Sequence, residues 1–479
     1  MRRFSCARSS AAGAGDLYGL RPTDVMNSLR FGFDTAWNGT AAQYAPSWFH
    51  DPSRKIRLKL GETALRTLRR AGPSRLDPVC AFWVNDRPVG QARCREGLET
   101  EAELGRAVVS WVAHPGERHA TARNDEAIAI RDIKIASIGD SFSSGEGNPH
   151  TRYVFGSVGA PAQWWDDRCH RSLVSSGALA AARLAIEMKH ASVTFVNYAC
   201  SGAEIRPGIL SEYLGRETVE QIESKYADQK RPPNVPFYRG RHLPAQMDRL
   251  RALLCRPGPF GCLDPAKLDL LLIGTGGNEV GFGNIVRYVL GGDASSRAGE
   301  IEAKMAGELR RLSDAFEDLS KVVKGLAPRH TVLLSYLDPT RDEDGLLCGT
   351  KPGRPVMTGI WNLLGIGTIS LRESHLVSKV ILEPLQKLHR DVAEQYQWTF
   401  VGGFQRNRGV CARPSWFRDY NTAQRLQDYL RSDATVRGGF PTGVMHPNYF
   451  GHRHVSERIY RAVLPLLAEP TPPFAVSSR

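Results

Sequence analysis

The stretch IKIASIGDSFSSGEG, residues 133 to 147, decides the fold of this chain. Its alternating isoleucines predict a buried strand over 133–138, and the glycine, aspartate and serine that follow predict a turn. In open α/β sheets the ligand crevice lies at the carboxyl ends of the strands. The turn therefore places the hydroxyl of Ser141 at the edge of the sheet where ligands bind.

Strands and helices alternate from residue 131 onward. Runs of branched and leucine side chains predict strands, and each is followed by a helical stretch, which is the pattern of a parallel sheet covered on both faces. We therefore expect a flavodoxin-like three-layer α/β/α domain with a five-stranded parallel sheet. The predicted strands are 133–138, 193–198, 268–273, 331–336 and 397–401, and the predicted helices are 172–189, 242–254, 299–325, 372–396 and 452–467.

The sequence before this domain has a different hydrophobic pattern. Short alternating runs at 56–60, 79–84 and 108–112, with turn dipeptides such as Asn85-Asp86, predict a small all-β, sandwich-like domain over 21–130. A helix-like stretch over 62–70 interrupts it. The expected division is a disordered N-terminus (1–20), the β domain (21–130), the α/β domain (131–467) and a frayed tail (468–479).

The composition is that of an ordinary globular protein of two or three domains, with 479 residues, of which 42% are hydrophobic and 24% charged. No apolar run approaches the roughly 20 residues of a membrane-spanning helix. The net charge is +13, but the arginines are scattered, so a solvated basic surface is the favoured interpretation. The alternative is an anionic partner, such as an acidic glycan or a phospholipid surface. We expect no nucleic acid.

The nine cysteines suit disulfides better than a metal site. Cys255 and Cys262 enclose a short proline and glycine loop, and Cys80 and Cys94 flank a predicted hairpin. No C-x-x-C and no Cys/His quartet with zinc spacing occurs. The pattern favours an oxidising, extracytoplasmic or secreted setting, although the N-terminus shows no clear signal peptide. The other cysteines are Cys169, Cys200, Cys348 and Cys411 on loops of the later domain, with Cys6 left over.

Four segments carry chemistry at the ends of the predicted elements. A serine nucleophile needs a base within hydrogen-bond reach and donors aimed at the developing oxyanion. Glycines let a backbone N–H approach a ligand, and asparagine can donate from its amide. The segments are Gly139-Asp-Ser141, Asn197-Tyr-Ala-Cys-Ser-Gly202, Gly274-Thr-Gly-Gly-Asn-Glu279 and Gly443-Val-Met-His-Pro-Asn448.

Over roughly residues 131–467 these segments resemble the SGNH (GDSL-type) hydrolase superfamily, whose marker residues are Ser, Gly, Asn and His. The resemblance implies that Ser141 is the nucleophile and His446 the general base. It also implies an oxyanion hole made by the N–H of Ser141, the N–H of Gly202 and the amide of Asn278. The motifs CHRS at 169–172 and ACSG at 199–202 resemble those of the secreted, disulfide-bonded actinobacterial esterase and lipase branch of this superfamily.

One position departs from the family pattern. The family has an aspartate three residues before the histidine, but residue 443 is glycine. The third member of a triad orients the imidazole and stabilises its charged form. A backbone carbonyl of Gly443 or Val444 is the favoured substitute, and the carboxylate of Asp433 is the alternative.

Several neighbouring residues have two interpretations. Asp140 is expected to bond the backbone of the nucleophile turn, and Glu279 to anchor structure. His170 and Arg171 either contact substrate or hold the loop. The pair Trp164-Trp165 either forms a wall for a sugar or packs inside the protein.

The sequence thus predicts a serine esterase that hydrolyses carboxylic esters of lipids, acylated carbohydrates or small alcohols through an acyl-serine. It needs no cofactor and no metal. The alternatives are an O-acyltransferase of the same fold, and a binding or adhesion protein whose site has decayed.

Overall fold

A computed structural model describes most of the chain. The described residues are 30–31, 51–71, 78–114, 120–121, 123–149, 164–188, 191–226, 241–255, 257–259, 261–263, 265–290, 296–351, 368–426 and 443–467. The segments expected to be a disordered N-terminus (1–20) and a frayed tail (468–479) lie outside them, as do Cys6 and Asp433.

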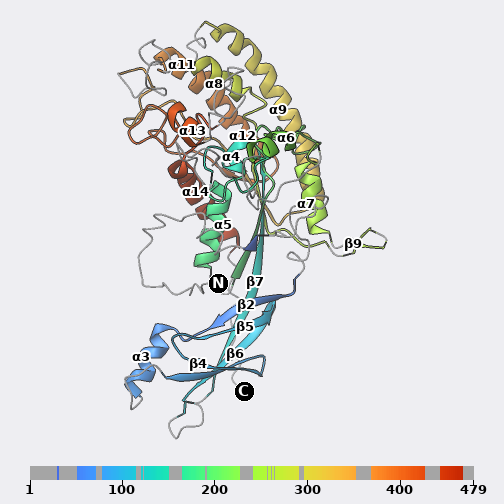
Figure 1. Cartoon of the computed structure of the whole chain (residues 1–479), viewed down its shortest axis with the longest axis vertical. Helices are drawn as coiled ribbons and strands as arrows, with labels where there is room; N and C mark the ends of the chain where they lie inside the picture. The colour runs from blue at the N-terminus through green and yellow to red at the C-terminus, as the bar shows by residue number, and fades with distance from the viewer. Residues whose placement is uncertain are drawn as a thin grey trace.

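One long strand, β7 (Asn124–Gly139), belongs to two kinds of sheet (Figure 1). Its first half pairs antiparallel with β6 (Gly105–Ala113), with Ile130 opposite Gly105. Its second half pairs parallel with two strands, so that Ile135 lies between Phe195 and Leu270. The expected domain boundary at 130/131 therefore falls inside a single continuous strand.

The parallel part has the strand order β1-β8-β7-β11-β12-β13. The five predicted strands are confirmed in position, although β7 begins nine residues before the predicted start. The expected number of five was one too low, because Arg30–Phe31 adds a strand at the edge beside β8. Two residues are too few to produce a readable pattern. The bounds are β1 (Arg30–Phe31), β8 (Ala191–Asn197), β11 (Leu270–Gly274), β12 (His330–Leu334) and β13 (Thr399–Val401).

Helices cover both faces of this sheet, with α5 and α14 on one side of β7 and α7 and α9 on the other (Figure 1). The five predicted helices are confirmed, but the fourth consists of α11, a π-helical stretch over Leu376–Leu382 and α12. Shorter helices were not predicted, namely α4 (Ser141–Ser144), α6 (Val219–Tyr226), α8 (Phe282–Leu290) and α13 (Tyr420–Leu426). The predicted ones are α5 (Ser176–Glu187), α7 (Gln246–Leu254), α9 (Ala298–Leu326), α11 (Leu371–His375), α12 (Glu383–Gln395) and α14 (Tyr449–Leu467).

The core of the parallel part is continuous from helix to helix through the sheet. Strand β11 is buried along its whole length, as expected of a central parallel strand. On one face, helix α9 packs through Leu312, Phe316 and Leu319, which are fully buried. Apolar burial of this kind supplies the main free energy that holds the sheet and its helices together.

The antiparallel region has a small core of its own. Strands β4, β3 and β6 continue the large sheet beyond β7, and β2 pairs with β5 in a second sheet. Asn85 and Asp86 both have positive φ values (48° and 62°), as a two-residue hairpin turn requires. The elements are β2 (Ser53–Leu58), α3 (Glu62–Ala71), β3 (Val79–Val84), β4 (Arg87–Arg93) and β5 (Leu98–Glu103).

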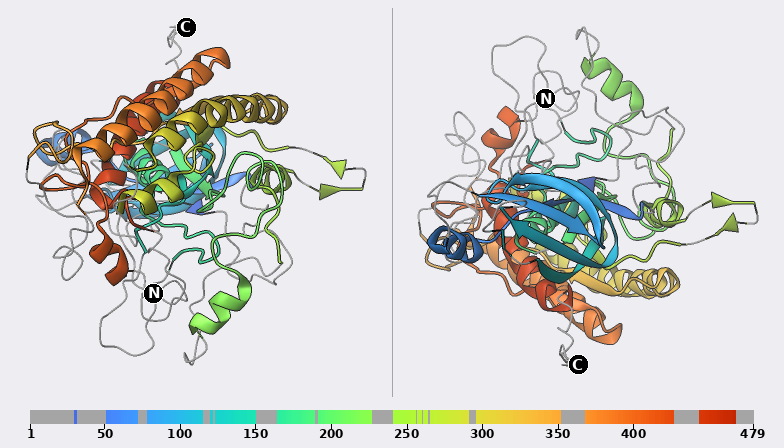
Figure 2. Two further views of the ribbon diagram at one scale, coloured as in Figure 1. Left: turned by 90° about the horizontal axis from the view of Figure 1, so that it is seen from above. Right: turned by 90° about the horizontal axis from the view of Figure 1, so that it is seen from below.

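The eight described cysteines form four disulfides. Two of these join the cysteines that enclose a predicted loop or hairpin, and the other two join loop cysteines for which the sequence suggested no partner. The pairs are Cys80–Cys94, Cys169–Cys200, Cys255–Cys262 and Cys348–Cys411. The third closes a hairpin of β9 (Pro257–Gly258) and β10 (Gly261–Cys262), which projects from the body of the protein (Figure 2). Within the described residues, no helix is long and apolar enough to cross a membrane.

Gly139, the last residue of β7, tests how tightly the nucleophile turn is fixed. Its φ is +136°, and a Cβ there would overlap the carbonyl oxygen of Gly274. We expect Gly139→Ala to lower the free energy of unfolding by at least about 2 kcal/mol, measured by urea denaturation. Gly307→Ala in α9 meets no such obstacle and should raise stability by roughly 0.5–1 kcal/mol. Equal effects of the two substitutions would contradict this account.

Candidate active site

Ser141 and His446, far apart in the sequence, lie in contact. Ser141 begins the short helix α4, whose first turn is capped by the Asp140 carboxylate accepting from the N–H of Phe142 at 3.0 Å. The Ser141 Oγ lies 2.8 Å from Nε2 of His446. Both residues are 6% exposed, so their hydrogen bond is largely screened from water. This is the contact that a serine needs in order to give its proton to a base.

The backbone orients His446. Its Nδ1 lies 3.1 Å from the carbonyl oxygen of Val444. A carbonyl can only accept, so Nδ1 carries the hydrogen and Nε2 is left as the acceptor facing Ser141. Met445 has a left-handed backbone (φ 59°), which folds the chain back far enough for this bond. Of the substitutes considered for the missing acid, the Val444 carbonyl occupies the position, whereas Asp433 lies outside the described residues.

Gly202 and Asn278 lie on loops that are tied to the nucleophile turn. The N–H of Cys200 donates to the carbonyl of Gly139 at 2.9 Å, just before Ser141. The amide of Asn278 donates to the carbonyl of Ala203 at 2.8 Å, which links the two loops and leaves a second amide hydrogen. Among the described residues, no protein acceptor takes the N–H of Ser141 or of Gly202. The resemblance noted in the sequence implies these three groups as the oxyanion donors.

Tyr336 holds the nucleophile turn to the Asn278 loop. Its hydroxyl donates to Asp140 Oδ2 and accepts from the N–H of Gly277 at 2.7 Å. Burial raises the pKa of Asp140 to about 6, while the Tyr336 hydrogen bond opposes that rise. Asp140 is therefore ionised at neutral pH and serves as a structural anchor, as the sequence analysis expected. Tyr336 was not predicted, because it follows a strand end that carries no glycine or turn signal.

Electrostatics keep His446 in the form of a base. Burial lowers the pKa of His446, and the negative charge of Glu146 opposes that effect. The imidazole is therefore neutral at neutral pH and can accept the serine proton. Glu146 was not singled out from the sequence, although it lies within the opening motif.

The two residues that were expected either to contact substrate or to hold a loop are buried. Arg171 pairs with Asp166 at 2.5 Å and donates to the carbonyl of Ala199 at 2.9 Å. His170 stacks on Trp164, with ring centroids 4.6 Å apart. Trp164 is 1% exposed, so its ring packs inside the protein and offers no face to a sugar.

Glu279 anchors the loop beside Asn278. One oxygen of its carboxyl group accepts from the N–H of Ile205 at 2.7 Å. Burial raises its pKa to about 8. Among the described residues this hydrogen bond is to backbone, which fits the structural role expected from the sequence.

Aromatic rings surround the imidazole of His446. The ring of Phe142 lies 5.3 Å from it and that of Phe282, the first residue of α8, 5.7 Å. Both phenylalanines are partly exposed. They therefore present an apolar surface beside the reactive pair. Neither was predicted, because an isolated phenylalanine after a motif is usually a packing residue.

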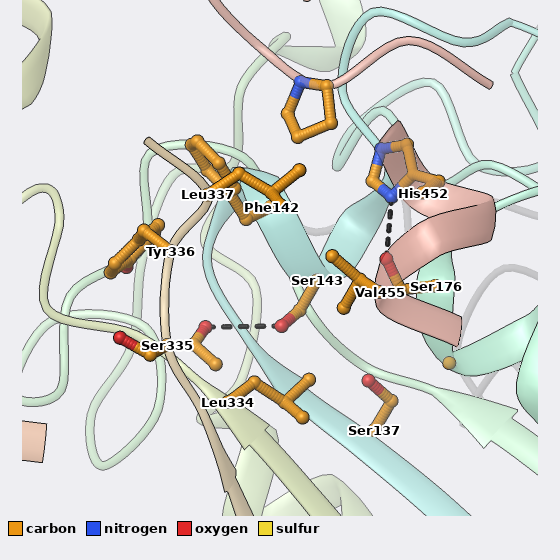
Figure 3. A pocket seen from close by; sticks show the side chains of 13 residues that line it. Ser137, Phe142, Ser143, Ser176, Leu334, Ser335, Tyr336, Leu337, His452 and Val455 are labelled. Atoms are coloured by element: carbon orange, nitrogen blue, oxygen red, sulfur yellow. Dashed lines mark hydrogen bonds between the residues drawn. The ribbon is translucent and has the colours of Figure 1, made fainter. Parts of the chain in front are cut away.

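A cavity of about 20 Å³ lies behind the nucleophile turn, lined in part by Phe142, Ser143 and Tyr336 (Figure 3). His452 reaches it from α14, with Nδ1 2.8 Å from Ser176 Oγ. Burial lowers the pKa of His452 to about 3, so the ring stays neutral. This volume is suited to a water molecule rather than a substrate. Ser141 and His446 do not line it.

No metal-ligating cluster of three or more His, Cys, Asp or Glu side chains occurs among the described residues.

No protein family and no curated protein matches the chain. Solved structures do. An extracellular lipase from Streptomyces rimosus matches 69% of this chain and 99% of its own, at 16% identity and a TM-score of 0.39. Phospholipase A1 from Streptomyces albidoflavus matches 70% and 98%, at 16% identity and a TM-score of 0.36. An acetyl xylan esterase from Butyrivibrio proteoclasticus matches 81% and 84%, at 11% identity and a TM-score of 0.26. Likenesses this weak do not indicate the function of this chain.

The Tyr336 hydroxyl gives a direct test of the anchoring network. Tyr336→Phe leaves the Gly277 N–H and the Asp140 carboxylate without that partner, and we expect the free energy of unfolding to fall by about 1–3 kcal/mol. Tyr396→Phe is the matched control, because among the described residues that hydroxyl has a single hydrogen bond, accepted from the neighbouring Gln395 side chain. Its effect should stay within about 0.5 kcal/mol. Urea denaturation of both variants decides the matter, and equal losses would show that the network contributes nothing specific.

Proposed function

We propose that this chain is a serine hydrolase of the SGNH type that cleaves carboxylic esters. The observation that carries the proposal is the 2.8 Å contact between Ser141 Oγ and His446 Nε2, with Nδ1 held by the Val444 carbonyl. A turn serine without a catalytic role has no need of an oriented imidazole at its hydroxyl. The neutral state of His446 and the unoccupied N–H groups of Ser141 and Gly202 support the same conclusion.

The first half of the proposed reaction acylates the serine. His446 Nε2 takes the hydroxyl proton as Ser141 Oγ attacks the carbonyl carbon of the ester. The oxyanion that forms accepts hydrogen bonds from the N–H of Ser141, the N–H of Gly202 and the amide of Asn278. The bond to the alcohol oxygen then breaks, and that oxygen takes the proton from His446.

The second half returns the enzyme to its starting state. Water gives a proton to His446 and attacks the acyl carbon, and the bond to Ser141 Oγ breaks. His446 then returns a proton to Ser141. The Val444 carbonyl lacks a negative charge, so the imidazolium formed in each step is stabilised by hydrogen bonding rather than by an adjacent carboxylate. No metal or cofactor is called for in this scheme.

The substrate is proposed as an ester of a lipid or of an acylated carbohydrate. The partly exposed rings of Phe142 and Phe282 beside His446 offer an apolar contact for the acyl group. The four disulfides support an oxidising, extracytoplasmic setting, where such substrates are found. An anionic surface attracted by the net charge of +13 belongs to the same proposal.

The arrangement of the chain is also proposed in finer terms. Without the short edge strand β1, the strand order β8-β7-β11-β12-β13 corresponds to the flavodoxin-like order 2-1-3-4-5 when these five strands are numbered along the chain. We assign residues 131–467 to the hydrolase domain and 21–130 to a sandwich-like β domain, except that β1 (Arg30–Phe31) belongs with the hydrolase domain because it pairs with β8. The continuity of β7 implies that the two are not joined by a linker.

Ester hydrolysis tests the proposal. We expect Ser141→Ala and His446→Ala each to lower kcat/KM toward p-nitrophenyl esters by roughly 10⁴-fold or more, because each removes a member of one catalytic unit. Ser320→Ala and His375→Ala, on α9 and α11, are the matched controls and should leave kcat/KM unchanged. An intact protein that neither turns over esters nor reacts with a fluorophosphonate would support a binding or adhesion protein. A rate that rises with added sugar alcohols would support an O-acyltransferase.

The third member of the triad has its own test. If the Val444 carbonyl orients His446, Asp433→Asn should leave kcat within about twofold of the wild type. A carboxylate partner would make the same change costly, because loss of a triad aspartate lowers kcat by roughly 10⁴-fold. Measuring kcat on the best p-nitrophenyl ester at neutral pH separates the two. A large loss in Asp433→Asn would contradict the carbonyl assignment.

A further inference from the structure

The Gly202 loop is held by a buried charged cluster that the proposed reaction does not use. His170 lies between two carboxylates, with Nδ1 2.8 Å from Glu146 Oε2 and Nε2 2.8 Å from Glu217 Oε1. The same Glu146 oxygen accepts from the Ser201 hydroxyl at 2.7 Å. Ser201 directly precedes Gly202. A chain of two hydrogen bonds therefore runs from the His170 imidazole to the residue before an oxyanion donor.

The contacts of His170 with Glu146 and Glu217 require a hydrogen on both ring nitrogens. A carboxylate can only accept, so an imidazole that bonds carboxylates through both nitrogens carries a hydrogen on each and is positively charged. Glu146 is fully buried and His170 is 5% exposed, so the charges compensate each other inside the protein. An unpaired charge at this depth would be costly. The cluster is therefore stable as a unit and is weakened when one member changes charge.

The loops around His170 are fixed at several points. His170 has a left-handed backbone (φ 48°), a conformation that persists in non-glycine residues only when the surroundings enforce it. The disulfide Cys169–Cys200 ties its loop to that of Ser201, and the Ser201 N–H donates to the Cys169 carbonyl at 3.1 Å. The Tyr213 hydroxyl donates to the Ser201 carbonyl. These contacts thus hold His170 in a strained backbone conformation beside the Gly202 loop.

We propose that protonated His170 is a positioning residue, which holds the Ser201–Gly202 turn through Glu146 so that attack by Ser141 depends on the charge of His170. The inference rests on the proposed function, since it concerns an oxyanion donor of that reaction. It adds to it a residue that touches no reacting atom. Glu217 sustains the charge from the opposite side of the ring.

The pH range in which this device acts follows from its charges. Burial lowers the pKa of His170, but the charges and hydrogen bonds of Glu146 and Glu217 raise it by more, so that the pKa is about 9. The other charged or titratable groups nearby are Arg168 and the Arg171–Asp166 pair on its own loop, Arg216 beside Glu217, and His446 across the site. As the pH rises through about 9, His170 loses a proton and one carboxylate loses its donor. The positioning is therefore complete at neutral pH and lost in alkali.

The experiment measures the rate at which a fluorophosphonate probe labels Ser141 in the full-length protein between pH 5 and 11. This rate needs the serine, the base and the oxyanion donors, but no knowledge of the natural substrate. For the wild type we expect an acid limb, as His446 becomes protonated, and a basic limb near pH 9. Glu217→Gln should move the basic limb down by about 1 pH unit and leave the acid limb in place.

A second variant keeps the test independent of the charge cluster's stability. Ser201→Ala removes the hydroxyl between Glu146 and the turn while all charges stay. We expect its labelling rate at neutral pH to fall roughly tenfold and its basic limb to disappear, because His170 no longer reaches the turn. His375→Gln, an exposed histidine on α11, is the control that should change neither limb.

The outcomes separate the inference from the proposed function. A wild-type protein labelled no faster than Ser141→Ala would overturn the serine hydrolase and this role together. Labelling with no basic limb, or a limb that Glu217→Gln and Ser201→Ala leave in place, would overturn the role of His170 alone. An NMR titration of the His170 ring near the ordinary histidine value of about 6.5 would also overturn it.

Discussion

The close approach of two glycine backbones at the ends of β7 and β11 is the constraint on which the site depends. Gly139 and Gly274 are paired in register, and the N–H of Asp140 donates to the Gly274 carbonyl at 2.9 Å. A side chain on Gly139 would overlap that carbonyl, so the two strands meet more closely there than other residues allow. The serine turn leaves one strand and the Asn278 loop leaves the other. Backbone contacts alone therefore set the position of the serine turn relative to the Asn278 loop.

The same edge of the sheet explains how a hydrolase could work without a triad carboxylate. A carboxylate beside His446 would raise the pKa of the imidazole and hold its ring. Here the ring is held by the Val444 carbonyl, and the negative charge that raises the pKa comes from Glu146 on a different loop. Orientation and charge, which one aspartate supplies in the usual arrangement, are divided between two groups. Burial opposes the charge, and the balance leaves a neutral base.

What the sequence could predict followed from local patterns. The positions of the parallel strands and long helices could be predicted because each carries its own periodicity. Gly202 and Asn278 were expected in the site because their segments resemble the SGNH superfamily, and because glycine and asparagine after strands can supply hydrogen-bond donors. The antiparallel continuation through β7 could not be predicted, since a sixteen-residue strand reads as two shorter ones when its partners change at Arg131.

Residues that act through distant contacts were missed for the same physical reason. Tyr336 bonds Asp140, which is 196 positions away in the sequence, and no local pattern encodes such a reach. Glu146 was part of the quoted motif, yet its partners His170 and Ser201 come from two other loops. His170 was considered, but its charge depends on both carboxylates, and only the fold brings them together. Pairings of this kind are set by topology rather than by the residues next to them.

Two of the disulfides reinforce loops at the candidate site. Cys169–Cys200 joins the His170 loop to the Gly202 loop, and Cys348–Cys411 anchors the segment that leads to Arg418. The backbone of Arg418 in turn exchanges hydrogen bonds with Met445 and His446, donating to the His446 carbonyl at 2.9 Å. In a sheet, the ladder of backbone hydrogen bonds already restricts motion. Loops hold fewer such bonds, so a cross-link between loops restricts motions that would otherwise be free. The Gly202 loop and His446, to which the proposed function gives the roles of oxyanion donor and base, are therefore each positioned by a disulfide as well as by polar contacts. These two disulfides therefore contribute to the geometry of the candidate site as well as to the stability of the fold.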